Sequence, residues 1–254
     1  MNDPRVSIVI PAYQEGEAIT PVLERIDDGL TLSHEILIVV DFEEDPTIPV
    51  VVEYAKTHPW VRVVVGEYGR GPANAIRYGI DNARAATAVV TMADGSDDVR
   101  IIDDMVRLSE RGCVVVAASR YMPGGRQIGG PKIKGLMSRA AGRSLHAFAG
   151  VGTRDATNSF KAYSTDFVRQ VGIESRAGFE IGLELTAKAR RLRLRLPIAE
   201  LPTIWLDRDL GESNFQLREW LPQYLFWYRF AYGRALTPAQ IRDLSTANEG
   251  TDQT

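Results

Sequence analysis

Several residue types and patterns are scarce in this chain. Its 254 residues include one cysteine and three histidines, and the histidines are scattered without metal-ligand spacing. We therefore expect neither a disulfide framework nor a histidine metal site. No apolar run reaches membrane-spanning length, and no apolar signal segment follows the first residues. These absences predict a globular protein of the cytoplasm, which meets a membrane only as a peripheral protein at the cytoplasmic face.

Two phosphate-binding motifs are also absent. The first predicted strand is not followed by G-x-G-x-x-G, and the chain contains no G-x-x-x-x-G-K-[ST]. These absences argue against a dinucleotide dehydrogenase and against a P-loop phosphate site.

No acidic residue lies between Glu110 and Asp155. Such a segment attracts phosphates, anionic lipid headgroups or nucleic acid, although a solvated basic face is the simpler alternative. The basic residues in it are Arg111, Arg120, Arg126, Lys132, Lys134, Arg139, Arg143 and Arg154.

Short, apolar, β-branched runs alternate with helical patterns along the chain. This alternation predicts an α/β fold with a doubly wound, mostly parallel sheet flanked by helices. In such sheets, ligands bind at the carboxyl ends of the strands. The predicted strands are Val6 to Ile10, Glu35 to Val40, Val61 to Val65, Ala88 to Met92 and Val114 to Ala118, and the predicted helices are Glu17 to Asp28, Pro49 to Thr57, Gly71 to Arg84 and Val99 to Arg111.

An aromatic ring and carboxylates follow the first two predicted strands. Pro11, Tyr13 and Glu15 come after the first strand, and Asp41 comes after the second. A ring can stack on a nucleobase, and a carboxylate can accept hydrogen bonds from the N–H groups of guanine or uracil. Glu15 and Asp41 could equally be acids at the start of a helix.

Three stretches follow one another along the chain: "VSIVIPAYQEGEAI", "ILIVVDFEEDPT" and "YGRGPANAIRYGIDNA". In this order they resemble the motifs of glycosyltransferase family 2, the nucleotide-diphospho-sugar transferases of GT-A fold, with Phe42 in place of an Asp of the usual pattern. The resemblance extends from about Val6 to Asn214. It implies that the nucleotide sugar is bound by Pro11, Tyr13, Glu15, Asp41, Gly71, Ala93 and Asp94.

Four later stretches are "ASRYMPGG", "SRAAGRSLHAFAGVGTRDATNSFKAYS", "GFEIGLEL" and "LDRDLGESN". They resemble motifs of the polyprenyl-phosphate sugar synthases of this family, typified by dolichol-phosphate mannose synthase. The resemblance implies that Arg120, Arg139 and Ser138 bind the lipid phosphate and that Arg208 meets the donor phosphates. Planar guanidinium groups suit this task because they bind phosphate at two points.

The stretch "TMADGSDD" stands where the family has Asp-x-Asp, which binds Mg²⁺ or Mn²⁺. Asp94 matches the second acid, Met92 replaces the first, and Ser96 is a further candidate ligand. Three interpretations stay open: Asp94 holds the metal together with the diphosphate and waters, Asp97 or Asp98 replaces the missing ligand, or basic residues such as Arg208 carry the charge of the leaving group. We expect Asp97 and Asp98 instead to cap the helix that begins near Val99.

These features predict an enzyme that transfers a hexose, mannose or glucose, from a nucleotide sugar to a polyprenyl phosphate, with the inversion that the family implies. Because the acceptor phosphate is already an anion, no general base is required. The catalytic candidates are Asp94, Arg120, Arg139 and Arg208. Two alternatives stay open: transfer to a hydroxyl with Glu180 or Glu184 as base, and a catalytically impaired nucleotide-sugar-binding protein.

We divide the chain into a transferase domain at residues 1–212, an aromatic-rich amphipathic helical segment at 213–240 and a disordered tail at 241–254. Pro222 should break any single helix in the second part. Its aromatic rings and arginines suit a membrane surface, and the alternative is packing on the domain or across a homodimer. We expect a nucleotide sugar, a lipid phosphate and a membrane surface as partners, and no nucleic acid.

Overall fold

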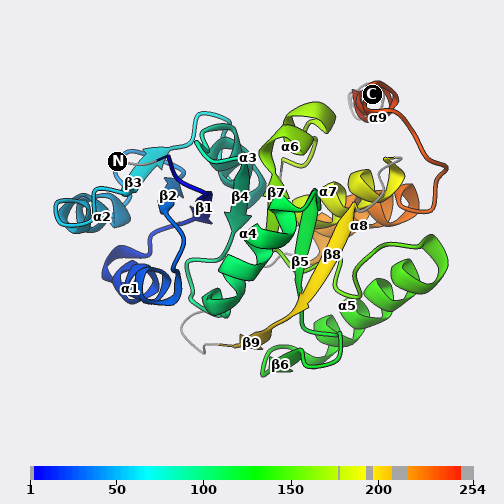
Figure 1. The fold of residues 1–254 in the computed structure, drawn as a ribbon, viewed down its shortest axis with the longest axis horizontal. Coiled ribbons are helices and arrows are strands. Elements are labelled where there is room, and N and C mark those ends of the chain that lie inside the picture. Colours follow the sequence, from blue (N-terminus) through cyan, green and yellow to red (C-terminus); the bar gives the residue numbers. More distant parts are fainter. Residues whose placement is uncertain (1–2, 177, 193–196, 208–216, 247–254) are drawn as a thin grey trace.

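The computed structural model describes residues 3–176, 178–192, 197–207 and 217–246. A seven-stranded sheet in the order β3-β2-β1-β4-β7-β5-β8 runs through the centre of the molecule (Figure 1). A separate two-stranded sheet pairs β6 with β9. The strands are β1 (Val6–Pro11), β2 (His34–Val40), β3 (Val61–Val65), β4 (Thr87–Val90), β5 (Val115–Ser119), β6 (Arg126–Ile128), β7 (Lys161–Ser164), β8 (Ile198–Pro202) and β9 (Ile204–Leu206).

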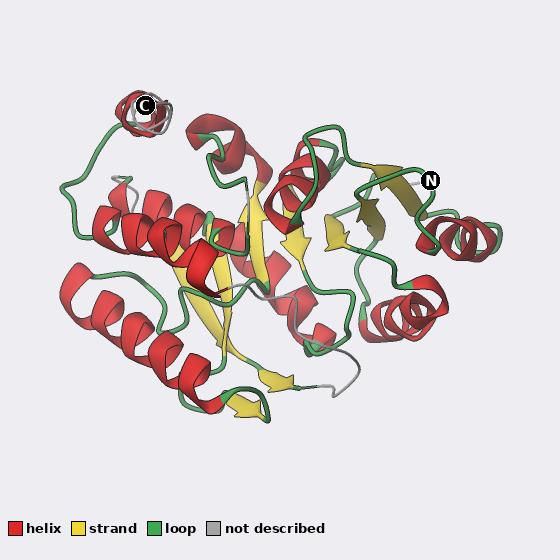
Figure 2. Cartoon of the chain, turned by 180° about the vertical axis from the view of Figure 1, so that it is seen from behind, coloured by secondary structure: helices red, strands yellow, loops and turns green. Residues whose placement is uncertain are grey.

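Helices cover both faces of the large sheet (Figure 2). They are α1 (Thr20–Gly29), α2 (Thr47–Ala55), α3 (Pro72–Asp81), α4 (Ile102–Glu110), α5 (Lys132–Ser144), α6 (Thr165–Val171), α7 (Ile181–Arg191), α8 (Leu217–Phe230) and α9 (Pro238–Thr246), with short turns η1 (Gly16–Ile19), η2 (Val99–Ile101) and η3 (Leu145–Ala149). None of the helices in the described ranges is long and apolar enough to cross a membrane.

The central strands are buried on both faces because their side chains alternate between two cores. In β1, Ile8 and Ile10 join the core under α1, α2 and α4, whereas Val9 joins the core under α3, α6 and α7. A strand that is covered on both sides needs apolar residues at successive positions. This requirement explains the continuous apolar runs from which the parallel sheet was predicted, and the prediction is confirmed.

One strand runs against the others. Strand β7 lies antiparallel between β4 and β5, so that Lys161 pairs with Val90 and with Ala117. The first residue of β7 therefore lies at the carboxyl ends of its neighbours, which is the edge where ligands bind in such sheets. The sequence patterns did not predict this strand.

Two predictions for the C-terminal part are wrong. Helix α8 runs through Pro222 without a break. Helix α9 covers residues 238–246, with Ile241 fully buried, although residues from 241 onward were expected to form a disordered tail. Residues 247–254 of that expected tail lie outside the described residues.

Candidate active site

The turn after β1 is held by two side chains from the loop after β2. The Gln14 N–H donates to Asp45 Oδ2 at 2.9 Å, and the N–H groups of Glu15 and Gly16 donate to Thr47 Oγ1 at 3.0 and 3.2 Å. These bonds hold Gln14 in the left-handed region, at a φ of 57°, which is uncommon for a residue with a side chain. The turn thereby presents Glu15 and its neighbour Tyr13 at the carboxyl edge of the sheet.

Asp41 lies at the end of β2 and accepts a hydrogen bond from the Gly71 N–H at 3.1 Å. Gly71 has a φ of 108°, a conformation that favours glycine, and it directly precedes α3. Burial raises the pKa of Asp41 above its ordinary value, although the bond from Gly71 opposes this effect. Asp41 therefore links the second and third βα loops and lies where the prediction placed it.

Two aromatic rings and an arginine stand beside these acids. The Tyr13 ring is 51% exposed and meets the Phe42 ring edge to face, with the centroids 5.9 Å apart. The Arg70 guanidinium lies over Phe42 at 5.5 Å from the ring centroid. An exposed ring beside an ordered carboxylate can stack on a base while the acid accepts its N–H groups.

The loop after β4 exposes one of its acids and buries another. Asp94 is exposed, and its Oδ1 accepts a hydrogen bond from the Ser96 N–H at 2.9 Å. Asp97 is buried and accepts from Thr91 Oγ1 at 2.9 Å and from the Met92 N–H at 3.3 Å. Asp97 thus closes the loop back onto the end of β4.

The capping prediction is confirmed for Asp98 and wrong for Asp97. The Asp98 side chain accepts from the Arg100 N–H at the start of η2. Asp97 points the other way, toward Thr91. Burial first, and then the charge of Asp94, raise the pKa of Asp97 to about 7.

Glu15 and Asp94 lie on different loops, but the charge of Asp94 acts on Glu15. Burial raises the pKa of Glu15, and the charges of Asp94 and Asp45 raise it further. Like charges that are held together disfavour ionisation unless a cation compensates for them. The edge formed by the loops after β1 and β4 therefore favours a cationic ligand.

The residues at this edge fit only one kind of metal site. Asp94 supplies a single exposed carboxylate because Met92 occupies the place of a second, and the buried Ser96 hydroxyl makes no hydrogen bond. Over the described part of the chain, no group of three or more acidic, histidine or cysteine side chains could hold a metal ion. Mg²⁺ is commonly bound by one or two carboxylates together with substrate phosphates and waters. The edge therefore fits a cation that arrives with a diphosphate and does not fit a cage made by protein ligands alone.

A basic cluster lies on the other side of β4 and β7. The Arg120 guanidinium binds both carboxylate oxygens of the fully buried Asp155, at 2.7 and 2.9 Å. Burial alone would lower the pKa of Arg120, but the hydrogen bonds and the charge of Asp155 raise it overall. Arg120 also lies 3.4 Å from Ser138 Oγ, which exchanges a 2.5 Å hydrogen bond with Thr157.

Tyr121 joins the two predicted phosphate-binding arginines. Its ring lies 4.9 Å from the Arg120 guanidinium and 5.0 Å from that of Arg139. Its hydroxyl donates to Ser138 Oγ at 3.2 Å. The structure therefore brings together all three residues that were expected to bind the acceptor phosphate: Arg120, which directly follows β5, and Ser138 and Arg139 of α5.

The remaining predicted residues fall into three groups. Pro11 ends β1, and Ala93 is buried behind Asp94. Arg208 lies outside the described residues. The two candidate bases, Glu180 and Glu184, are fully buried, and Glu184 accepts the N–H groups of residues 174 and 175 while it pairs with Lys188 at 2.6 Å. Glu184 is therefore a structural acid.

Sequence reasoning missed the side chains that hold the candidate ligands in place. Asp45 and Thr47 fix the turn after β1, Asp155 orients Arg120, and the Tyr121 ring contacts the guanidinium groups of Arg120 and Arg139. All four lie inside stretches that match the family motifs. The signal was present, but only the folded chain shows which partner each of them serves.

The mostly parallel α/β sheet, with acids at its carboxyl edge and a basic cluster beside them, has the architecture of the GT-A fold. Two solved structures share this fold. The mannosyltransferase PcManGT from Pyrobaculum calidifontis, in complex with GDP-Man and Mn²⁺, aligns with a TM-score of 0.62 and 18% identity over 97% of this chain and 70% of its own. Glucosyl-3-phosphoglycerate synthase from Mycobacterium tuberculosis, in complex with UDP, aligns with a TM-score of 0.63 and 16% identity over 91% and 81%.

The chain belongs to Glycosyl transferase family 2, whose sequence profile matches residues 7–172. Among its relatives, the undecaprenyl-phosphate mannosyltransferase of Micrococcus luteus is 29% identical over 217 residues, which are 83% of this chain and 87% of the relative. The polyprenol monophosphomannose synthase of Mycolicibacterium smegmatis is 25% identical over 232 residues, 85% and 86% of the two chains. The predicted family and GT-A fold are confirmed.

Proposed function

We propose that this transferase moves a hexose from a nucleoside-diphospho-sugar to a polyprenyl phosphate, with inversion at the sugar carbon. The names of the relatives from Micrococcus luteus and Mycolicibacterium smegmatis support the acceptor class. A dolichyl-phosphate β-glucosyltransferase of Dictyostelium discoideum, 23% identical, keeps glucose beside mannose as a candidate sugar.

The observation that carries the proposal is the cluster of Arg120, Arg139 and Ser138 around Tyr121. It combines two guanidinium groups with a hydroxyl, a set that suits a phosphate monoester. Such a phosphate is mostly a dianion at neutral pH because its second pKa is about 6. It can attack without losing a proton to the enzyme, which agrees with the structural role of Glu184.

The donor would bind at the acidic edge. Tyr13 would stack on the base, while Glu15 and Asp41 would accept hydrogen bonds from the nucleoside, and Gly71 allows close approach of the backbone. Asp94, with Ser96 beside it, would hold Mg²⁺ or Mn²⁺ against the diphosphate, and the bound ion would offset charge on the leaving nucleoside diphosphate. We assign Arg208 to the donor phosphates from the family resemblance alone.

Helix α5 turns its bulky apolar side chains outward, which suits an acceptor embedded in a membrane. Ile133 is 74% exposed, Leu136 69% and Phe148, in the following turn η3, 81%. Its inward face carries small residues such as Gly142, where a Cβ would lie only 2.0 Å from a backbone oxygen. A soluble helix normally buries its large apolar residues. We assign the outward face of α5 to an anionic membrane surface, because it lies in the acid-free basic segment.

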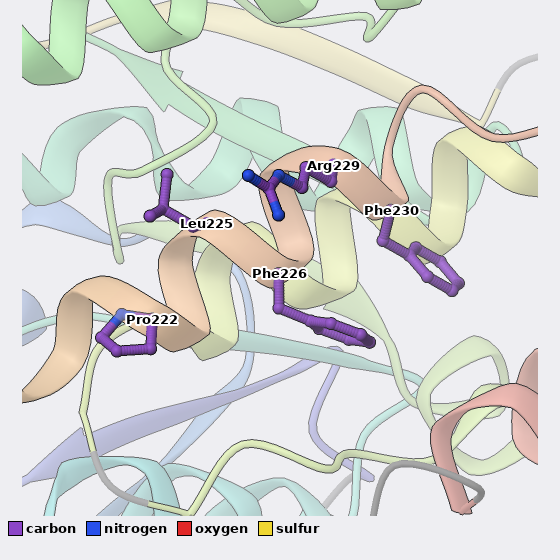
Figure 3. A pocket seen from close by; sticks show the side chains of 5 residues that line it. All are labelled: Pro222, Leu225, Phe226, Arg229 and Phe230. Carbon is purple, nitrogen blue, oxygen red and sulfur yellow. The ribbon is translucent and has the colours of Figure 1, made fainter.

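Helix α8 extends this surface. The Ser144 hydroxyl at the end of α5 lies 2.7 Å from the Tyr228 hydroxyl of α8, so the two helices meet at this point. The rings of Trp227 and Phe230 pack against α7, as one interpretation of the sequence anticipated. Farther out, a shallow pocket lies along α8 (Figure 3), lined by Pro222, Leu225, Phe226, Arg229 and Phe230.

The decisive experiment supplies GDP-mannose and UDP-glucose, each with Mg²⁺ or Mn²⁺, together with undecaprenyl phosphate or undecaprenol. Sugar should appear on the phosphate and not on the alcohol. Transfer to the alcohol would support the hydroxyl-acceptor alternative instead. Tight donor binding with no transfer to either acceptor would show that the replacement by Met92 has left a nucleotide-sugar-binding protein.

A further inference from the structure

Lys161 is a fully buried lysine in the middle of the sheet. It is the first residue of the antiparallel strand β7, and its register partner in β4 is Val90, the last residue before the "TMADGSDD" loop. Its amine therefore lies under the edge at which the donor and acceptor sites meet. Buried lysines are rare and are retained where the amine has polar partners.

The Lys161 amine bonds to the loop that leads into β7. Nζ donates to the backbone oxygen of Ala156 at 3.1 Å and also to the backbone oxygen of Asn158. Gly182 of α7 leaves the space that the amine occupies, because a Cβ there would lie 3.2 Å from Nζ. The two acceptors flank Thr157, so one amine spans the whole turn.

The same loop carries the groups that organise the acceptor cluster. Asp155 binds the Arg120 backbone N–H at 3.0 Å and both sides of its guanidinium fork. Thr157 exchanges a 2.5 Å hydrogen bond with Ser138, and the Asn158 amide donates to the Ala118 backbone oxygen at 2.8 Å. Three successive attachments to β5 and α5 therefore depend on the path of residues 155–158.

From these contacts we infer that Lys161 is a positioning residue for the acceptor phosphate: it holds the 155–158 loop and, through that loop, Arg120 and Ser138. The inference rests on the function proposed above. In it, Lys161 contacts neither substrate but controls the orientation of the groups that bind the acceptor.

The charge state of the amine is compatible with this role. Burial lowers the pKa of Lys161 to about 7. The charge of Arg120 also lowers this pKa, and the charge of Asp155 opposes the effect. A neutral amine still has two N–H groups to donate, so the contacts to Ala156 and Asn158 persist whether or not the third proton is bound.

The test compares Lys161→Met with Lys188→Met. Lys188 is a matched control because it is also fully buried and also donates to two backbone oxygens, those of Val171 and Gly172, but it lies on α7 and pairs with Glu184. Loss of two hydrogen bonds should raise the KM for undecaprenyl phosphate by roughly tenfold in Lys161→Met. The donor Kd, measured by calorimetry, should stay within roughly twofold of wild type. Lys188→Met should lower the melting temperature without a selective rise in the acceptor KM.

Hydrogen exchange of the backbone amides at 155–158 separates failure of this inference from failure of the proposed function. Faster exchange at these amides in Lys161→Met, in an enzyme that transfers no sugar to a lipid phosphate, would leave the positioning role standing and overturn the acceptor. Unchanged exchange in Lys161→Met, or a loss of donor affinity as large as the loss of acceptor affinity, would overturn the positioning role. If Lys161→Met does not fold, Lys161→Gln, with a shorter donor, should show the same selective defect in smaller size.

Discussion

The acidic donor edge, formed by the loops after β1, β2 and β4, and the acceptor cluster, formed by Arg120, Arg139 and Ser138 around Tyr121, are both ordered by hydrogen bonds to charged groups. The charges are negative at the donor edge and positive in the acceptor cluster. At the donor edge, N–H and hydroxyl groups orient carboxylates, as Gly71 does for Asp41 and Thr91 for Asp97. In the acceptor cluster, the carboxylate of Asp155 orients the guanidinium of Arg120. One sheet edge can hold both acids and arginines without mutual neutralisation because Asp41, Asp97 and Arg120 each have a fixed local partner.

The two arginines of the acceptor cluster differ in the same respect. The Arg120 guanidinium is paired with Asp155, whereas Arg139 forms no ion pair with any residue that the structure describes. The free charge for a substrate phosphate should therefore come mainly from Arg139, and Arg120 should shape the site around it.

The largest expected effect follows from this difference. Arg139→Ala should reduce kcat/KM for undecaprenyl phosphate by about 100-fold or more, the loss typical for one charged donor at a reacting centre. Donor affinity should be nearly intact, since Arg139 lies on the acceptor side. Initial rates and calorimetry with the nucleotide sugar measure the two sides separately.

Arg143→Ala removes the same charge one turn farther along α5 and serves as the control for Arg139→Ala. It should stay within a few-fold of wild type when a short-chain polyprenyl phosphate is supplied in detergent. A loss of donor affinity in Arg139→Ala as large as the loss of transfer would contradict the division into two regions.

The next effect concerns the outward face of α5. The double variant Ile133→Ser with Leu136→Ser should bind vesicles of anionic phosphatidylglycerol roughly tenfold more weakly, because it removes apolar side chains that partial insertion into the lipid would bury. Cosedimentation measures the change. Val52→Ser on α2, another half-exposed apolar residue, should not alter binding. Monomeric variants of a dimeric wild type, with unchanged vesicle binding, would assign this face to a homodimer instead.

Asp94→Asn tests the acidic edge. The substitution should weaken metal-dependent donor binding by roughly tenfold, about 1.4 kcal/mol, because it removes the exposed carboxylate available to the cation. Titration of GDP-mannose and UDP-glucose with and without Mn²⁺ reports the change. Asp98→Asn, in the same loop but engaged with Arg100, is the control. Binding that needs no metal in either protein would assign the diphosphate charge to basic residues.

The smallest effect is a pH dependence of stability. With a folded pKa of about 7 for Lys161, the unfolded chain holds a proton above pH 7 that the folded chain has released, so rising pH favours folding until the amine also deprotonates in the unfolded chain. The unfolding free energy of wild type relative to Lys161→Met should therefore rise on the order of 1 kcal/mol between pH 7 and pH 8.5. Urea unfolding at several pH values measures it. A flat difference would mean that the Lys161 amine stays charged beside Asp155.

Much of the sheet could be predicted because burial on both faces requires continuous apolar runs, and β1, β2 and β3 show them plainly. Strand β7 escaped because it is four residues long and begins with a lysine. The break predicted at Pro222 does not occur, because the packing of Trp227 and Phe230 on α7 stabilises α8 despite the proline.

The features of the candidate site also fall into those that the sequence determines and those that only the tertiary structure determines. The sequence by itself determined the family, the acids that follow β1, β2 and β4, and the basic character of the segment around α5, because these depend on residue type and local order. The tertiary structure alone decided that Asp97 turns back to Thr91, that Asp155 occupies Arg120, and that Lys161 lies under the 155–158 loop. Those contacts join residues from different elements, and a hydrogen bond depends on distance and direction in space, which residue types do not encode.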